Sequence, residues 1–437
     1  MKNYLLKLYN ALFIISPFMI FAGMLQVHFQ KFLPYQEYFR GKYFFDFCSV
    51  TDIFVGLLII IFIAICVSGQ LKPASRKIPL ELLIAIALIF IAGILEIFFQ
   101  KTYEPILTTK AEYFRTMLLY PIIYVLLIYK TLDQKTINRL LISYILMIII
   151  FCAAALAQYF FNIFPGVNQD FMARLVWPYI DFVTLKWESA NWVAFFVTPG
   201  LMISFVKVVN AIKARKFSAE FYIFSAALAF SAITIYFVQS YAAYGAIFIA
   251  IALYLFRALQ FKHFAIALLI LALISSVIYE VQKNSMKYRI MTGTKEYRYE
   301  TSVEARKDIW KMNLQIIKDH PFMGVGLNQY QSYFAQNAAI LGHEFNELTI
   351  PPHSHNFFIS FWLALGLPGF AAMLILIAGA FWRSKFSPAL PAIFVLAAIM
   401  IHGLADSYYW KQEIAYTVWL IIIFAYLYRD KILVQVK

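Results

Sequence analysis

The chain has 437 residues, of which 62% are hydrophobic and only 14% are charged. Soluble globular proteins carry about 25% charged residues, so this composition excludes a string of soluble domains and predicts an integral membrane protein. A net charge of +14 would suggest a nucleic-acid partner in a soluble protein. Here much of that charge lies in short segments between apolar runs, where it sets membrane orientation, and we expect no nucleic acid.

Apolar runs long enough to cross a bilayer, about 20 residues each, recur along the whole chain. We predict one membrane domain, residues 1–437, with an all-α fold of about 12 transmembrane helices. Most Lys and Arg residues of the short connections fall on the side of the N-terminus, so both termini should be cytoplasmic. The runs lie near residues 8–29, 47–68, 79–99, 114–130, 139–164, 191–209, 220–239, 243–256, 263–280, 356–381, 389–408 and 414–428.

Three acidic residues, Asp52, Glu96 and Asp406, lie inside or at the ends of apolar runs. Ionisable groups are costly in a membrane and therefore mark candidate functional sites. An equally good interpretation is that they pair with basic residues to hold helices together. The sequence favours none of the three over the others.

A polar segment, residues 165–190, precedes the sixth span and contains Arg174 in the stretch Arg-Leu-Val-Trp-Pro. Its aromatic residues suit the membrane interface. Arg174 is either an anchor that reaches toward the interface or a ligand for an anion. The residues alone leave both interpretations open.

A long loop, residues 281–355, separates the ninth and tenth spans. Apolar residues at helical intervals predict an amphipathic helix over 303–319, with Thr301 and Glu304 at capping-box spacing. Arg306 falls on one stripe of this helix, where it is either a solvated charge or a ligand for an anion at the membrane surface. His320-Pro321 ends the helix, and Gly324-Val-Gly326 forms a turn.

The loop ends at Pro351-Pro-His-Ser-His355-Asn356, directly before the tenth span. Ser354 or Asn356 can cap the new helix, which places His355 at a helix mouth. Gly366 and Gly369 fall within about 40° of His355 on a continuous helix. Small residues there would let a neighbouring helix approach and hold the imidazole, as a general base or acid requires.

A metal site would need more than the sequence offers. His343, His353 and His355 with Glu344 or Glu347 include a feasible HxH spacing, but they complete no recognised ligand pattern. The three cysteines lie in apolar stretches without CxxC spacing. We therefore expect no metal and no cofactor.

The pattern Arg306-x3-Trp310, Asp319-His-Pro-Phe-Met-Gly-Val-Gly326-x3-Tyr330 and His355-Asn356-x9-Gly366-x2-Gly369 resembles the signature of the O-antigen ligase and polymerase superfamily. Arg174 followed by Asn191-x2-Ala194 is similar to an earlier family pattern. One position departs: many members carry a Ser-Arg pair between the seventh and eighth spans, where this chain has Ser240-Tyr241.

The resemblance implies an enzyme of the bacterial inner membrane with a periplasmic loop and active site. It would move a glycan from a polyprenyl diphosphate carrier to a lipid A-core acceptor, without a metal and with inversion. His355 would be the catalytic base, supported by Asn356, Gly366 and Gly369. The cationic ligands of the donor diphosphate would be Arg174, Arg306, Arg289 and Arg298.

Several alternatives stay open at this point. An O-antigen polymerase and a protein O-oligosaccharyltransferase of the same superfamily would use the same donor, although the His-Asn-x9-Gly-x2-Gly form favours the ligase. The glycan, the acceptor and the oligomeric state are not fixed by the sequence. A multi-pass transporter or flippase would instead require polar residues at mid-membrane, whereas here they gather at one surface.

Overall fold

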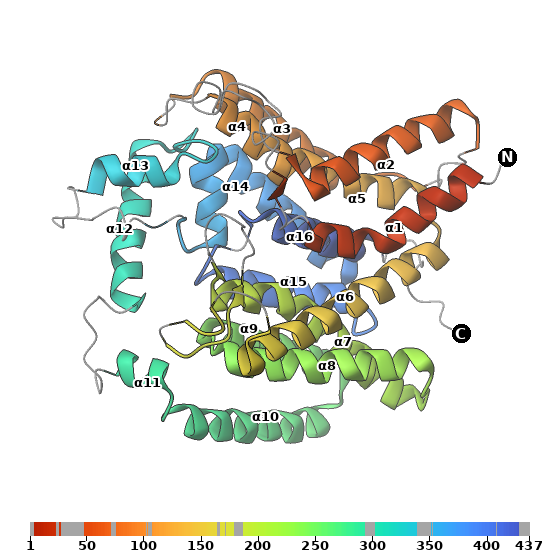
Figure 1. Ribbon diagram of the computed structural model, residues 1–437, viewed down its shortest axis with the longest axis vertical. Coiled ribbons are helices and arrows are strands. Elements are labelled where there is room, and N and C mark those ends of the chain that lie inside the picture. The colour runs from red at the N-terminus through yellow and green to blue at the C-terminus, as the bar shows by residue number, and fades with distance from the viewer. Residues whose placement is uncertain are drawn as a thin grey trace. The chain divides into compact units, whose positions relative to one another are not determined.

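The computed structural model describes residues 4–22, 26–27, 48–70, 76–101, 103, 107–163, 167–170, 172–178, 187–292, 302–338, 351, 353–407 and 409–427. Within them the fold is helical (Figure 1), as predicted. The described strands are two-residue pieces that form two antiparallel pairs, β1 (Gln26–Val27) with β2 (Cys48–Ser49) and β3 (Trp177–Pro178) with β4 (Trp187–Glu188). The chain divides into two compact units, described separately below.

Ten described helices, or contiguous helical stretches, are long and apolar enough to cross a membrane. Two shorter apolar helices, α15 (Pro391–Gly403) and α16 (Gln412–Leu427), overlap the last two predicted apolar runs. Leu269 is 62% exposed and Ile60 is 65% exposed, as suits side chains that face lipid. The ten are Tyr4–Ala22 (α1), Val50–Val67 (α2), Leu80–Phe98 (α3), Lys110–Thr131, Gln134–Phe161 (α6), Ala190–Ala214 (α7), Ala219–Val238 (α8), Tyr241–Ala258 (α9), Phe261–Gln282 (α10) and Phe357–Ser384 (α14).

The first unit comprises residues 1–140, 306–383 and 403–433. Its core is α16, in which every residue from Glu413 to Leu427 is buried. The stretch Lys110–Thr131 belongs to α4 (Leu107–Phe114), the π-helical turn η2 (Arg115–Leu119) and α5 (Tyr120–Thr131). A π-turn inserts one residue into a helix and redirects the side chains next to it; here it carries the buried Arg115.

The predicted amphipathic helix is present as α12 (Ser302–Asp319). Its apolar face packs on α13 (Tyr330–Asn337) and on Leu363, with Ile309, Met312 and Ile316 buried in the contact. Thr301 lies outside the described residues, so the capping box stays a prediction.

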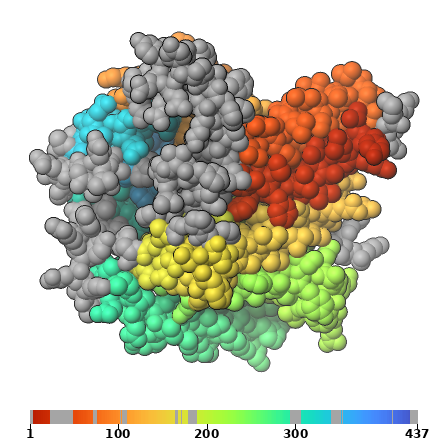
Figure 2. All heavy atoms as spheres, in the orientation of Figure 1, coloured from red at the N-terminus to blue at the C-terminus, as the bar shows by residue number. Residues whose placement is uncertain are grey.

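The second unit comprises residues 141–305, 384–402 and 434–437. It contains most of α6 and of α15, together with α7, α8, α9, α10 and the short helix α11 (Met286–Met291). In α7 most residues are buried, because α8 and α9 cover it. By contrast, the one buried residue of α10 is Gln282. Side chains of α8 and α10, in green, form part of the surface seen in Figure 2.

Candidate active site

The site lies at the start of α14, in the first unit. Asn356 caps the helix, because its Oδ1 accepts hydrogen bonds from the backbone N–H groups of Phe358 and Ile359, both at 3.0 Å. Its Nδ2 donates to the carbonyl of Leu404, and its backbone N–H donates to Ser407 Oγ at 3.0 Å. These bonds fix the segment 353–356 against the loop between α15 and α16. Asn356 is therefore the helix cap that its sequence position predicted.

Asp406 is the centre of the side-chain cluster. Its Oδ1 lies 2.9 Å from His355 Nδ1 and 3.3 Å from His353 Nε2. Its Oδ2 lies 3.5 Å from a terminal guanidinium nitrogen of Arg306. The carboxylate is 4% exposed, whereas the Arg306 and His355 side chains are 23% and 22% exposed. The cluster thus has a buried anion at its base and partly accessible cationic and imidazole groups above it.

The protonation states follow from these contacts. Burial alone would raise the pKa of Asp406, but hydrogen bonds from His353 and His355 hold that pKa well below its usual value. An ionised carboxylate only accepts hydrogen bonds, so His355 Nδ1 must carry the proton of the shared bond. In neutral His355 the lone pair is then on Nε2, which has no hydrogen-bond partner among the described residues. Burial lowers the pKa of His353, against the opposing effect of Asp406.

Arg306 comes to this cluster from the first turns of α12. The same helix also holds the histidine segment, because Asn313 Nδ2 donates to the carbonyl of Ser354 at 2.8 Å. Tyr330 OH in turn donates to Asn313 Oδ1. The Nε of Arg306 is buried and makes no hydrogen bond within the described part of the chain. Arg306 and His355, predicted from separate motifs, are therefore brought together by the structure.

The glycine-rich turn meets α14 where that helix is broken. Gly366 has φ +64° and ψ −166°, a backbone conformation that favours glycine. The break frees the carbonyl of Leu363, which accepts the N–H groups of Val325 and Gly326. A Cβ at Gly366 would collide with the carbonyl oxygen of Phe322.

Gly366 and Gly369 were predicted to lie beneath His355 on one continuous helix and to let a neighbouring helix approach, and the structure differs from this. His355 has φ +50° and precedes the helix, so no continuous helix joins it to Gly366. The close neighbour of Gly366 is the Phe322–Gly326 turn rather than a second helix. At Gly369 an added Cβ would meet the side chain of Leu365 in the same helix.

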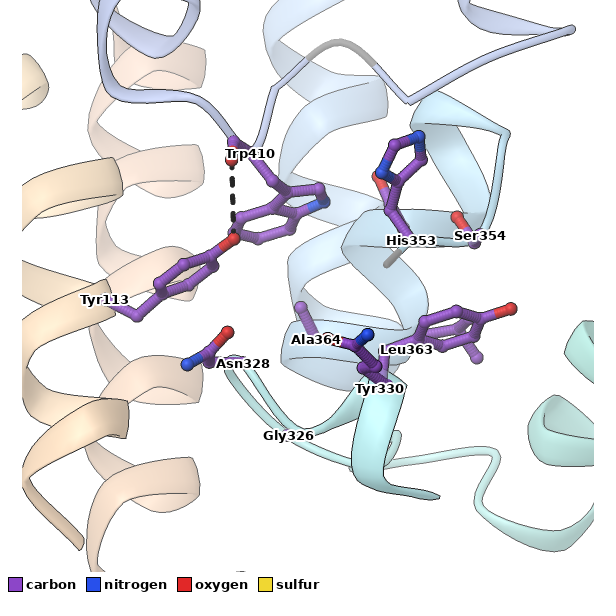
Figure 3. A pocket seen from close by; sticks show the side chains of 11 residues that line it. Tyr113, Gly326, Asn328, Tyr330, His353, Ser354, Leu363, Ala364 and Trp410 are labelled. Atoms are coloured by element: carbon purple, nitrogen blue, oxygen red, sulfur yellow. Dashed lines mark hydrogen bonds between the residues drawn. The ribbon is translucent and has the colours of Figure 1, made fainter. Parts of the chain in front are cut away.

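A small pocket opens beside His353 (Figure 3). Its volume is about 70 Å³, which is enough for a few water molecules and too small for a sugar. Tyr113 donates a hydrogen bond to the Trp410 carbonyl at one side, and Asn328 lies below it. His353 and Ser354 form the opposite side. This pocket gives solvent a route to the imidazole of His353.

The same cluster has donor atoms suited to a metal ion. One ligand atom from each of His353, His355 and Asp406 lies within 4.8 Å of the others, and such a donor set suits zinc. However, the Asp406 carboxylate already faces the guanidinium of Arg306. That cation would repel a divalent ion. The earlier candidates His343, Glu344 and Glu347 lie outside the described residues.

The other predicted arginines belong to the second unit. Arg174 forms a paired contact with Asp170, in which both Nε and a terminal nitrogen lie 2.7 Å from Oδ2. Arg289 is exposed on α11, and Arg298 lies outside the described residues. At Ser240-Tyr241, where many family members carry a Ser-Arg pair, Lys287 Nζ lies 4.0 Å from the ring centroid of Tyr241. A lysine thus supplies a cation beside the turn that lacks the arginine.

The sequence identifies Asp406 as a candidate functional residue but gives no reason to prefer it to the other two acidic candidates. Its signal, an acidic residue at the end of an apolar run, was shared with Asp52 and Glu96. The decisive feature is its contact with residues 51 and 53 positions earlier, which no local pattern reveals.

The geometry defines a multi-pass membrane protein with an Asp–His pair and an arginine at one helix mouth. A family model described as O-antigen ligase matches residues 226–374, and this match supports the O-antigen ligase superfamily. The matched segment includes Arg306, His355 and Gly366, while Asp406 lies beyond it. No curated protein matches the chain. The family match supports a membrane glycosyltransferase of the ligase and polymerase superfamily.

Proposed function

We propose that the protein is an O-antigen ligase-type transferase that moves a glycan from a polyprenyl diphosphate carrier to a lipid A-core acceptor. The observation that carries the proposal is the 2.9 Å contact between His355 Nδ1 and Asp406 Oδ1. It fixes the imidazole and directs Nε2 outward as a proton acceptor, the arrangement that general-base catalysis requires.

In the reaction, His355 Nε2 takes the proton of the acceptor hydroxyl. The hydroxyl oxygen forms a bond to the anomeric carbon, and the bond from that carbon to the phosphate oxygen breaks. The electron pair leaves with the polyprenyl diphosphate, so one displacement inverts the anomeric configuration. Asp406 stabilises the imidazolium that forms.

Arg306 supplies positive charge for the leaving diphosphate. Its guanidinium is partly exposed, and its Nε is an unused donor among the described residues. Arginine suits this task because it stays charged and can donate two parallel hydrogen bonds. Arg174, Arg289 and Arg298 are further proposed ligands of the donor. With arginine in this position, the transfer needs no metal.

The proposed setting is the bacterial inner membrane, with both termini in the cytoplasm and the active site at the periplasmic face. The distribution of Lys and Arg supports this orientation. The loop at residues 281–355 would then lie in the periplasm, where lipid-linked glycan and acceptor meet.

The test is transfer by the purified protein in liposomes, with a polyprenyl diphosphate-linked glycan and lipid A-core as substrates. We expect His355→Ala to lower the rate by about 10³-fold or more while the protein stays inserted and folded. We expect EDTA to leave the wild-type rate unchanged. Retained transfer in His355→Ala would exclude this residue as the base.

The lipopolysaccharide of a deletion strain separates the related activities. Loss of glycan from the core supports a ligase, whereas single-repeat caps would indicate a polymerase. Unchanged bands would contradict both, and activity that EDTA removes and a divalent ion restores would contradict the metal-free mechanism.

A further inference from the structure

The small pocket beside His353 has a wall that suits a neutral, hydrogen-bonding ligand. Its volume is about 70 Å³, which is room for about two groups the size of a water molecule. None of the residues that line it is Lys, Arg, Asp or Glu, and all of them belong to the first unit. Tyr113, Tyr330 and Trp410 contribute aromatic rings to the wall. Such a wall binds uncharged polar groups and has no cation for a phosphate.

The indole of Trp410 is fixed at one side of the pocket. It stacks on the ring of Tyr113, with centroids 5.5 Å apart and planes at 19°. The rings of Phe361 and Tyr409 contact it at centroid distances of 5.3 Å and 5.2 Å. Within the described part of the chain, the hydrogen bond from Tyr113 goes to the Trp410 carbonyl, and the indole Nε1–H has no acceptor. A rigid donor is therefore available to a ligand.

His353 supplies the matching acceptor at the opposite side. Its Nε2 lies 3.3 Å from Asp406 Oδ1, and an ionised carboxylate only accepts hydrogen bonds, so Nε2 carries the proton. Burial lowers the pKa of His353, so the ring is neutral at pH 7 and Nδ1 has a lone pair. Nδ1 has no hydrogen-bond partner among the described residues. Figure 3 shows a ring nitrogen of His353 and the indole nitrogen of Trp410 turned toward each other.

The remaining polar groups of the pocket fall into two sets. The hydroxyls of Ser354, Ser360 and Tyr330 donate hydrogen bonds to other protein groups. The amides of Asn328 and Gln331 are exposed and make no hydrogen bond to a described residue. The groups open to a ligand are therefore one donor and one acceptor inside the pocket, and two amides that face solvent.

A hydroxyl group fits the donor and the acceptor together, because it both donates and accepts hydrogen bonds. It can accept from Trp410 Nε1 and donate to His353 Nδ1. A whole sugar ring is too large for the pocket, but a hydroxymethyl group has one carbon and one oxygen and occupies about the space of two water molecules. A methyl group of the same size would leave both partners without a hydrogen bond. The carbon-bound hydrogens of a sugar also suit an aromatic wall.

The two oxygens of Asp406 separate the pocket from the proposed donor site. Oδ2 faces Arg306 at 3.5 Å, the cation proposed for the donor diphosphate. Oδ1 faces both His353 and the proposed base His355. The pocket lies on the Oδ1 side, so a sugar held there lies on the side of the base rather than on that of the diphosphate ligand.

We propose that this pocket binds the hydroxymethyl group of the acceptor sugar. Its hydroxyl accepts a hydrogen bond from Trp410 and donates one to His353, and the amides of Asn328 and Gln331 bind ring hydroxyls at the mouth. The assignment to the acceptor rests on the proposed function, whereas the choice of pocket and of chemical group rests on the geometry.

The variants change one feature of the pocket at a time. Trp410→Phe keeps an aromatic ring and removes the donor. Trp382→Phe is its matched control, because Trp382 is 85% exposed and does not line the pocket. Asn328→Gly removes an amide at a residue with φ +58°, which glycine adopts without strain. Ala364→Val narrows the pocket, and Ala371→Val changes the same helix away from it.

The first experiment measures binding of methyl glycosides to the purified full-length protein by saturation-transfer NMR, in a detergent without sugar groups. The probes are methyl glucoside and methyl 6-deoxyglucoside, which has a methyl group in place of the hydroxymethyl group. We expect the wild type to bind the glucoside about fivefold more tightly, the effect of one neutral hydrogen bond. Trp410→Phe should reduce this preference to less than about twofold, and Trp382→Phe should keep it. Equal binding of the two probes by the wild type, or binding of neither, would overturn the proposal.

The second experiment separates acceptor from donor by transfer kinetics in liposomes. Ala364→Val should raise the KM for the lipid A-core acceptor about fivefold and leave the KM for the donor unchanged, and Asn328→Gly should do the same to a smaller extent. Ala371→Val should change neither. A rise in the KM for the donor alone would place the donor glycan in the pocket and overturn the assignment.

His355→Ala distinguishes this proposal from the proposed function, because His355 does not line the pocket. We expect this variant to keep the preference for methyl glucoside and to transfer nothing. If it keeps the preference and also retains transfer, the proposed function fails alone. If the preference is absent from the wild type while His355→Ala loses transfer, the pocket proposal fails alone.

Discussion

Asp52 and Asp406 are two carboxylates of the first unit that each face an arginine, and their surroundings differ. Asp52 lies 3.6 Å from Arg115, with side chains 2% and 0% exposed. It also accepts hydrogen bonds from Ser49 N–H and Gln412 Nε2. Asp406 faces Arg306 at 3.5 Å, but it also holds two histidines, and its arginine is 23% exposed.

The difference separates a structural ion pair from one that we propose to be reactive. At Asp52 the neighbours include an amide side chain and its own helix cap, and no substrate can reach the side chains from solvent. At Asp406 the carboxylate is hydrogen-bonded to the imidazole of His355, and that side chain is partly exposed. A buried Asp–Arg pair alone thus indicates little about function; the accessible titratable neighbour does.

The largest effect is expected for Asp406→Asn, with Asp52→Asn as the matched control. An amide at position 406 can impose the wrong tautomer on His355, which should lower the transfer rate about 10³-fold. Asp52→Asn should lower the thermal midpoint in detergent while the rate per folded molecule stays within about twofold. Equal losses of rate in both variants would remove the distinction between the two clusters.

Arg115→Met should mainly reduce stability. Removing one partner of a buried ion pair leaves the other charge without compensation, at a cost of about 3–5 kcal/mol. The double variant Asp52→Asn/Arg115→Met should be less destabilised than Arg115→Met alone. Denaturation of the detergent-solubilised protein measures both, and a double variant that is the less stable of the two would contradict this explanation.

Gly366→Ala tests how the glycine-rich turn supports the Asp406 cluster. The added Cβ would strain a backbone with positive φ and collide with the Phe322 carbonyl, so we expect a loss of about 1–3 kcal/mol. Gly245→Ala has open space around its Cβ and serves as the control in a helix. Equal stability of the Gly366→Ala protein and wild type would show that the turn can shift freely.

The smallest effect concerns pH. Because the pKa of His353 is lowered in the folded protein, the unfolded chain binds its proton first as pH falls below about 6.5. Stability from this group is therefore full above pH 6.5 and declines as pH falls toward the folded pKa. His353→Gln should flatten that decline by less than about 1.4 kcal/mol per pH unit. Thermal midpoints between pH 5 and 8 measure it, and identical slopes would contradict it.

The sequence predicted much of this fold because membrane spans and amphipathic helices depend on local composition and period. The long apolar runs and the helix that bears Arg306 follow directly from such patterns. Arg306 and His355 were found because each stands in a motif of fixed spacing. In the structure both side chains contact Asp406.

Other features depend on contacts between distant segments. Asp406 meets His355 through a turn after α15, and the break at Gly366 exists because the Phe322–Gly326 turn inserts there. A helical period cannot anticipate such an interruption, since the apolar pattern continues across it. The cavity lined mainly by α8, α9 and α10 was not predicted either, because these helices have the composition of ordinary apolar spans.

The interruption at Gly366 also has a mechanical meaning for a protein in a bilayer. Spanning helices adapt to membrane thickness by tilting, and a rigid α14 would transmit that tilt to the histidine at its mouth. Here a nine-residue cap, Phe357–Leu365, is tied to the Phe322–Gly326 turn instead. The turn bonds to both sides of the break, because the Leu363 carbonyl accepts from Val325 and Gly326 and the Leu367 N–H donates to the Phe322 carbonyl. We therefore expect the turn to resist a change of tilt at the break and to hold the imidazole of His355 in place when the thickness of the surrounding lipid changes.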